Sequence, residues 1–194
     1  MEAPRNSGKT TTACVSVLQK VDAFNPQCQA LMLTSSHRTA MHALKVTLAL
    51  GSHKIQCHVC TDRAHIREDK MRLEKGAHIV VGTPSYVQEI IGHGALVTKS
   101  IRVLILDRVD EMISEGSKDA IEELFQTIPR STQVVFLLNK TFAALKDMTT
   151  KLMHNPVWIS HTEEADLDDS ETLTEPGHRS DDKLYEMEVR RHRR

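Results

Sequence analysis

The stretch Ala3–Thr10 reads Ala3-Pro4-Arg5-Asn6-Ser7-Gly8-Lys9-Thr10, and it decides how the rest of the chain is interpreted. Its spacing is that of a phosphate-binding loop, in which backbone N–H groups surround a phosphate at the start of a helix. A lysine in such a loop reaches the β and γ oxygens, and a Ser or Thr hydroxyl binds Mg²⁺. We therefore expect this stretch to bind a nucleotide, with Lys9 and Thr10 in those two roles. The usual pattern has glycine where Ala3 stands, so the alternative is a helix start without a ligand.

The composition is that of an ordinary globular chain, because 40% of its 194 residues are hydrophobic and 26% are charged. One domain with a tail is expected. No apolar run approaches the roughly 20 residues that span a bilayer, and the first residues lack the order of a signal peptide. The four cysteines are too sparse for a disulfide framework, so we expect free thiols and a reducing compartment. The expected protein is a cytoplasmic monomer, with the nucleus as the alternative compartment.

Helical and strand-like segments alternate along the chain after the loop. A helix begins at Thr11 and is expected to end at Asn25-Pro26. The further helices are predicted over residues 40–48, 64–73, 86–91, 118–128 and 142–153, and the strands over residues 30–33, 55–60, 78–81, 101–106, 133–137 and 157–159. The strands are continuous apolar runs, so both of their faces should be covered and they should pair in parallel. This predicts an open three-layer α/β fold with a mainly parallel sheet.

Asp107 directly follows the apolar run 101–106. Phosphate-loop enzymes place an acidic residue at such a strand end to hold Mg²⁺. Parallel topology brings this strand end to the same sheet edge as Gly8, so Thr10 and Asp107 are the predicted metal-binding residues. The alternative is that Asp107 is only a turn residue.

The residues from Asp107 through Met112, together with Val80–Pro84 and Cys57–Cys60, resemble the first RecA-like domain of DEAD-box ATP-dependent RNA helicases. The resemblance is greatest to the translation initiation factor 4A branch, and it extends from Ala3 to about Leu167. It implies a RecA-like fold, ATP and Mg²⁺ as cofactors and RNA as a partner. It also implies RNA contacts from Thr83 and Pro84, and a scaffold of the initiation factor 4G type as a further partner.

The departures from the family pattern fall at functional positions. Where the family has Asp-Glu-Ala-Asp, this chain has Asp107, Arg108, Val109 and Asp110. The family glutamate orients the attacking water, and arginine cannot act as a base because it keeps its proton. We therefore expect no intact catalytic residue and impaired hydrolysis, while Arg108 still attracts phosphate.

Two motifs that link the nucleotide to RNA have also changed. The family Ser-Ala-Thr reads Leu138-Asn139-Lys140, so the hydroxyls that would pair with Asp110 are absent and Lys140 is a candidate replacement. The family Gly-Gly reads Asp62-Arg63, which adds side chains and a negative charge where the RNA backbone would approach.

The resemblance also predicts the domain organisation. Residues 1–162 correspond to the ATP-binding domain, whereas the composition of residues 163–194 indicates an acidic linker with a basic end. The strand that feeds the phosphate loop would precede Met1, so we expect a truncated first strand, either unpaired backbone groups or an open groove in the sheet, and marginal stability. The second RecA-like domain would follow the tail.

Two functions remain open from the sequence, beside a third possibility, that the chain is the unfolded product of a decaying gene copy. The first is a degenerate ATP-binding helicase domain, and the second is a non-catalytic protein that competes with a full-length helicase for scaffold partners. A zinc site built from residues 53, 57, 58, 60 and 65 is the weaker alternative, because a zinc ribbon normally brings a second ligand pair.

Overall fold

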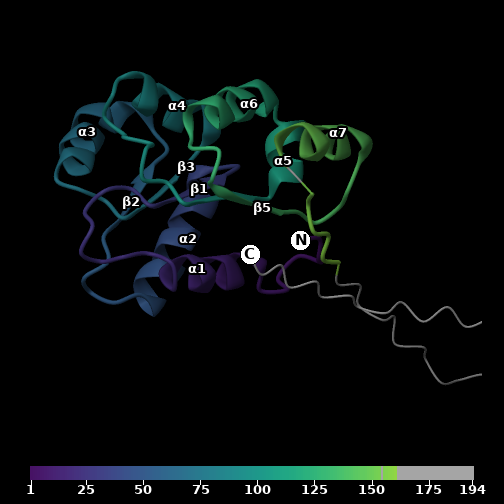
Figure 1. The fold of residues 1–194 in the computed structure, drawn as a ribbon, viewed down its shortest axis with the longest axis horizontal. Helices are drawn as coiled ribbons and strands as arrows, with labels where there is room; N and C mark the ends of the chain where they lie inside the picture. Colours follow the sequence, from purple (N-terminus) through teal and green to yellow (C-terminus); the bar gives the residue numbers. More distant parts are fainter. Residues whose placement is uncertain (154, 161–194) are drawn as a thin grey trace, which may run out of the picture. The chain divides into compact units, whose positions relative to one another are not determined.

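A computed structural model describes residues 1–153 and 155–160, and within them a single parallel sheet organises the chain (Figure 1). The five strands lie in the order β2-β3-β1-β4-β5, and every neighbouring pair is parallel. Their bounds are β1 Ala30–Thr34, β2 Cys57–Cys60, β3 Ile79–Gly82, β4 Val103–Asp107 and β5 Gln133–Leu137. The predicted α/β class and parallel sheet are thus confirmed.

Helices cover both faces of the sheet, as the continuous apolar strands predicted (Figure 1). Alternate residues of β1 point to opposite faces, so Leu31 and Leu33 belong to one core and Ala30 and Met32 to the other. The first core packs against α3 Ile66–Glu74, α4 Pro84–Gly92, α5 Val109–Ser114, α6 Lys118–Thr127 and α7 Ala143–Leu152. The second packs against α1 Lys9–Leu18 and α2 His37–Leu50.

Local signals fix the ends of two helices near the candidate site. Ser36 and Thr39 form a reciprocal capping box at the start of α2, which satisfies backbone N–H groups that have no partner within the helix. Pro84 occupies the first position of α4, where its fixed φ suits a helix and its missing N–H costs nothing.

The structure corrects three of the predicted elements. α1 ends at Leu18, well before Asn25-Pro26, because the Gln29 side chain holds a loop by bonding to Asp22 and Asn25. α5 was not predicted, since its six residues are too few to show a helical period. Residues 157–159 form no strand, and Ser160 makes only an isolated bridge to Glu2.

The prediction that Cys57–Cys60 is buried on both faces was also wrong. β2 lies at the edge of the sheet, and of its residues only Cys60 is fully buried. Residues Met1–Glu163 form one compact unit, and the proposed linker and tail lie outside the described residues. None of the helices that the structure describes is long and apolar enough to cross a membrane.

Candidate nucleotide-binding site

The loop before α1 has the backbone that a phosphate site requires. Gly8 has a φ of 83° and Asn6 a φ of 64°, the left-handed conformation that glycine adopts freely and asparagine tolerates. No side chain caps the helix, and the first backbone hydrogen bond of α1 is donated by Thr12 to Gly8. The preceding N–H groups of Gly8 through Thr11 have no acceptor within the described part of the chain. They are available to an anion at the positive end of the helix.

Lys9 lies in the first turn of α1 with only 7% of its surface exposed. Its ammonium donates hydrogen bonds to the carbonyl oxygens of Ala3, at 2.6 Å, and Pro4, at 2.5 Å. Burial lowers the Lys9 pKa, and the nearby carboxylate of Asp107 opposes that shift. The ammonium is thus held over the loop by neutral carbonyl groups. An anionic phosphate oxygen can take their place, because it forms a stronger, charge-assisted hydrogen bond with the ammonium.

Thr10 and Asp107 meet although 97 positions separate them in the sequence. The Thr10 hydroxyl donates a 2.6 Å hydrogen bond to Oδ2 of Asp107 at the C-terminal end of β4. Asp107 is 2% exposed, and burial raises the pKa of its carboxyl against the opposing effect of this hydrogen bond. The structure therefore brings Lys9, Thr10 and Asp107 to one sheet edge.

This set of donors fits Mg²⁺ with a nucleoside triphosphate. A hydroxyl and a carboxylate oxygen are ligands that Mg²⁺ prefers, and a bound cation would remove the cost of keeping Asp107 ionised while buried. Gly8 faces open space, since no atom lies within 4 Å of the position that a Cβ would take. A phosphate can therefore approach the loop backbone closely.

Arg108 has a left-handed backbone, with a φ of 63°, at the point where the chain turns from β4 into α5. Its guanidinium donates to Glu111 at 3.3 Å, and Arg5 from the phosphate loop donates to the same carboxylate oxygen at 3.3 Å. Ser35 donates to the other oxygen of Glu111 at 3.2 Å. Glu111 therefore connects the phosphate loop, the residue that follows β1 and the residue that replaces the family glutamate.

The carboxylate of Asp110 has fewer hydrogen-bond partners than the family pattern predicts. The backbone N–H of Asn139 donates to Asp110 Oδ2 at 3.1 Å, while the buried Oδ1 has no hydrogen-bond partner among the described residues. The suggested ion pair from Lys140 to Asp110 is not formed within that part of the chain. A main-chain group thus replaces only one of the hydroxyl partners expected from the family.

The predicted RNA-contacting residues lie at the adjacent end of β3. Thr83 precedes α4 and Pro84 opens it, at the same sheet edge as Asp107. Beside them, Asp62 caps the short helix η1 Arg63–His65 through the Ala64 N–H, and Arg63 pairs with Glu89 at 2.6 Å. The two residues in place of Gly-Gly are therefore engaged in contacts of the protein itself.

Of the residues considered for zinc, the structure brings His58 and Cys60 close to Asp69, with donor atoms within 4.8 Å of one another. The Asp69 carboxylate is already bonded to His58 Nε2 and to the Tyr86 hydroxyl, each at 2.8 Å. Burial raises the pKa of the Cys60 thiol, which favours its protonated form. This cluster is a satisfied hydrogen-bond network.

Sequence reasoning found Lys9, Thr10 and Asp107 but missed Glu111 and the role of the Asn139 backbone. A charged residue on a short helix carries no special sequence signal, although its position three residues after Arg108 is the spacing of a helical ion pair. The Asn139 N–H could not have been found, because a backbone donor is the same in every residue except proline.

The comparisons with known proteins agree with this architecture. Residues 1–147 match the model of the DEAD/DEAH box helicases. The chain is 40% identical over 159 residues to the ATP-dependent RNA helicase eIF4A of Schizosaccharomyces pombe, covering 81% of this chain and 41% of that protein. The eIF4A of Neurospora crassa is also 40% identical over 159 residues, covering 81% of this chain and 40% of its own length.

Solved structures show the same fold. A Saccharomyces cerevisiae Dbp5 variant, bound to a Gle1 variant and IP6, has a TM-score of 0.76 at 22% identity. The match covers 84% of this chain and 42% of that one. The chain thus spans about two fifths of the curated relatives that it matches. On the family match and the five-stranded parallel sheet together, the chain belongs to the DEAD/DEAH box helicase family.

Proposed function

We propose that this chain is a degenerate DEAD-box ATP-binding domain that holds Mg·ATP and hydrolyses it very slowly or not at all. The observation that supports binding most directly is the 2.6 Å contact between Thr10 and Asp107 beside the buried Lys9. In this proposal Ala3–Thr10 surrounds the phosphates, Lys9 binds the β and γ oxygens, and Thr10 and Asp107 hold the metal.

Impaired hydrolysis follows from the side chain at position 108. A general base contributes typically 10²–10⁴-fold to a rate, and an arginine that keeps its proton contributes none of it. The guanidinium of Arg108 instead adds positive charge near the phosphates. Binding and chemistry are therefore separated, with the triphosphate bound and the attacking water left without a base.

Titration with a fluorescent ATP analogue, with and without Mg²⁺, tests this function. We expect Mg²⁺-dependent binding by the wild type and at least a tenfold loss of affinity in Lys9→Ala, with Lys20→Ala as an exposed lysine control. ATP hydrolysis should stay at the Lys9→Ala background, with or without RNA. Equal affinity of the wild type and Lys9→Ala would refute nucleotide binding, and RNA-stimulated turnover above that background would refute the loss of catalysis.

RNA binding is proposed as weak. Thr83 and Pro84 remain at the sheet edge, but Asp62 and Arg63 occupy the position of the close backbone approach and add a carboxylate beside it. We expect affinity for single-stranded RNA to rise several-fold in the double variant Asp62→Gly, Arg63→Gly. No change in RNA affinity would show that these side chains do not limit it.

The second candidate is an interaction protein that competes with a full-length helicase for a scaffold of the initiation factor 4G type. The orphaned Asp110 Oδ1 and the Arg63–Glu89 pair favour it, because both weaken the coupling of ATP to RNA while the fold is kept. Competition for the scaffold by Lys9→Ala, equal to that by the wild type, would support this candidate. Scaffold binding that required ATP would favour the first.

A further inference from the structure

The guanidinium groups of Arg5 and Arg108 share one carboxylate, that of Glu111. Arg5 Nη2 lies 3.3 Å from Glu111 Oε1, and Arg108 Nη1 lies 3.3 Å from the same oxygen and 3.5 Å from Oε2. One negative charge thus faces two positive charges. The cluster of these three side chains is therefore net positive and can accept an anion.

Both arginines lie next to the residues of the candidate nucleotide site. Arg5 belongs to the loop Ala3–Thr10, and Arg108 directly follows Asp107, the carboxylate proposed to hold the metal. Burial lowers the pKa of the Lys9 ammonium, and the nearby positive charge of Arg108 lowers it further. A phosphate bound at Lys9 is therefore close to the guanidinium of Arg108.

The contact between Arg108 and Glu111 is weak. Hydrogen bonds between guanidinium and carboxylate groups are typically about 2.7–2.9 Å long, whereas the shorter contact here measures 3.3 Å. The Arg108 side chain is 36% exposed, and exposed ion pairs contribute little because water screens them. A terminal phosphate has three oxygens and more negative charge than a carboxylate, and its geometry suits a guanidinium. Such a phosphate can therefore draw Arg108 away from Glu111.

Glu111 keeps other hydrogen-bond donors when Arg108 leaves. The Ser35 hydroxyl donates to Oε2 at 3.2 Å, and Arg5 donates to Oε1. The Glu111 side chain is only 24% exposed, so a carboxylate without donors would be costly there. Because two donors remain, the release of Arg108 does not carry that cost.

We propose that Arg108 binds the γ-phosphate of the nucleotide, and that Glu111 binds this guanidinium when the γ-phosphate is absent. Arg5 and Ser35 keep Glu111 paired after the exchange, so they are positioning residues that do not touch the nucleotide. This inference rests on the proposed function and specifies its ligand class, because a nucleoside diphosphate has no γ-phosphate. The residue in place of the family glutamate thus selects triphosphate over diphosphate.

Competition titrations in Mg²⁺ with ADP and with the non-hydrolysable β,γ-imido analogue of ATP test this selection. We expect the wild type to bind the triphosphate analogue at least tenfold more tightly than ADP. Arg108→Gly should lose most of this preference and keep its ADP affinity. Glycine adopts the φ of 63° without strain, so this variant should fold. A wild-type preference near one, or an unchanged preference in Arg108→Gly, would overturn the proposal.

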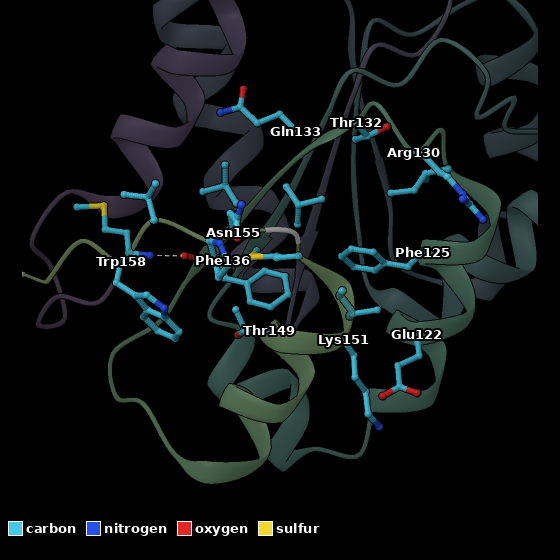
Figure 2. Close-up of a pocket in the computed structure, with 18 of the residues that line it drawn as sticks. Glu122, Phe125, Arg130, Thr132, Gln133, Phe136, Thr149, Lys151, Asn155 and Trp158 are labelled. Atoms are coloured by element: carbon cyan, nitrogen blue, oxygen red, sulfur yellow. Dashed lines mark hydrogen bonds between the residues drawn. The ribbon is translucent and has the colours of Figure 1, made fainter. Parts of the chain in front are cut away.

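Arg130→Ala is the matched control for the loss of an arginine. Arg130 precedes β5 at the N-terminal end of the parallel strands, whereas Arg108 follows β4 at their C-terminal end. Figure 2 shows the Arg130 side chain among the residues that line the cavity beside β5. This variant should keep the wild-type preference. An equal loss in Arg130→Ala and Arg108→Gly would indicate a general effect of charge and would contradict the proposal.

Glu111→Gln tests whether this carboxylate competes with the γ-phosphate, because it removes the charge and keeps the shape. It should raise the triphosphate affinity several-fold and leave the ADP affinity unchanged. Glu115→Gln is the matched control, since Glu115 is an exposed carboxylate one turn further along, at the end of α5. An equal rise for both nucleotides, or the same rise in Glu115→Gln, would refute the competition.

Arg5→Ala removes one of the two cations that hold Glu111, so this carboxylate should keep Arg108 more tightly. The triphosphate affinity should then fall several-fold. Adding Glu111→Gln to Arg5→Ala should restore it, because no carboxylate then competes for Arg108. A loss that persists in the double variant would show that Arg5 itself binds the nucleotide, which would refute its positioning role.

ADP binding separates this inference from the proposed function. Equal, Mg²⁺-dependent affinities of the wild type for ADP and the triphosphate analogue would refute the role of Arg108 and leave the nucleotide site intact. No binding of either nucleotide would refute the proposed function, and this inference with it.

Discussion

The buried carboxyl of Asp107 lowers the stability of the folded chain and, in the proposed function, binds the metal. Its carboxyl is buried, and its pKa is raised because burial disfavours the charged form. At a pH above the raised folded pKa the group is ionised in both the folded and unfolded chains, so the folded chain carries the penalty of keeping a charge buried. As the pH falls through the raised folded pKa, the folded state takes up the proton first, and the penalty is gone below the ordinary aspartate pKa of about 4.

Asp107→Asn should therefore raise the unfolding midpoint at pH 7, and this gain should shrink as the pH falls toward 4. Thermal unfolding across that range measures it, with the exposed Asp147→Asn as the matched control. The same substitution should abolish Mg²⁺-dependent ATP binding. A variant that is less stable than the wild type at pH 7 would show that Asp107 is not penalised by its burial.

Arg108 gives a second prediction at this scale. A residue other than glycine in the left-handed region costs on the order of 1 kcal/mol, so Arg108→Gly should recover part of that cost. It should lose only a partly exposed ion pair with Glu111. We expect stability to rise by about 0.5 kcal/mol in urea unfolding. Arg108→Ala keeps the strain and loses the pairing, so a gain of the same size in that variant would contradict the explanation.

Close packing between neighbouring strands and helices can be tested by single substitutions. Gly82 ends β3, and a Cβ there would lie 2.4 Å from both the Cys60 carbonyl oxygen and a methyl carbon of Val87. Gly82→Ala should therefore cost about 1–3 kcal/mol through overpacking. Gly92→Ala is the matched control, since nothing lies within 4 Å of its added methyl group. Equal unfolding midpoints for the two variants would show that β3 and β2 are not packed as described.

The capping box of α2 can be tested by a substitution with a smaller expected effect on stability. Ser36→Ala removes a side-chain oxygen that accepts from the Thr39 N–H and should cost about 1 kcal/mol. Ser16→Ala, on the exposed side of α1, should change the unfolding midpoint little. Similar losses from both substitutions would argue against a capping role for Ser36.

Sequence patterns predicted most elements because the strands consist mostly of apolar residues and the long helices have an apolar face. The phosphate loop and Asp107 were predictable for a different reason, since parallel topology brings strand ends to one edge. The contacts of Glu111 with Arg5 and Ser35 could not be predicted, because they depend on where a loop and a short helix meet in space. The prediction of a strand over residues 157–159 was wrong, since their apolar side chains are largely exposed.

At the scale of the whole molecule, the reactivity of the four cysteine thiols measures whether the two hydrophobic cores around the sheet stay closed to solvent. Burial raises the pKa of both Cys28 and Cys57 to about 12, and Cys14 and Cys60 are fully buried. We expect fewer than one rapidly reacting thiol per native chain toward a disulfide reagent at pH 8, and four after denaturation. Two or more fast thiols in the native chain would show that a core opens.

Thr10 and Asp107 lie far apart in the sequence and meet at one sheet edge, where we propose that they hold the metal. One measurement tests this most directly. Calorimetric titration of ATP at a series of Mg²⁺ concentrations should show the wild-type affinity rising at least tenfold with Mg²⁺, and no such rise in Thr10→Val. The same Mg²⁺ dependence in Thr10→Val and the wild type would contradict the claim that Thr10 and Asp107 together hold the metal.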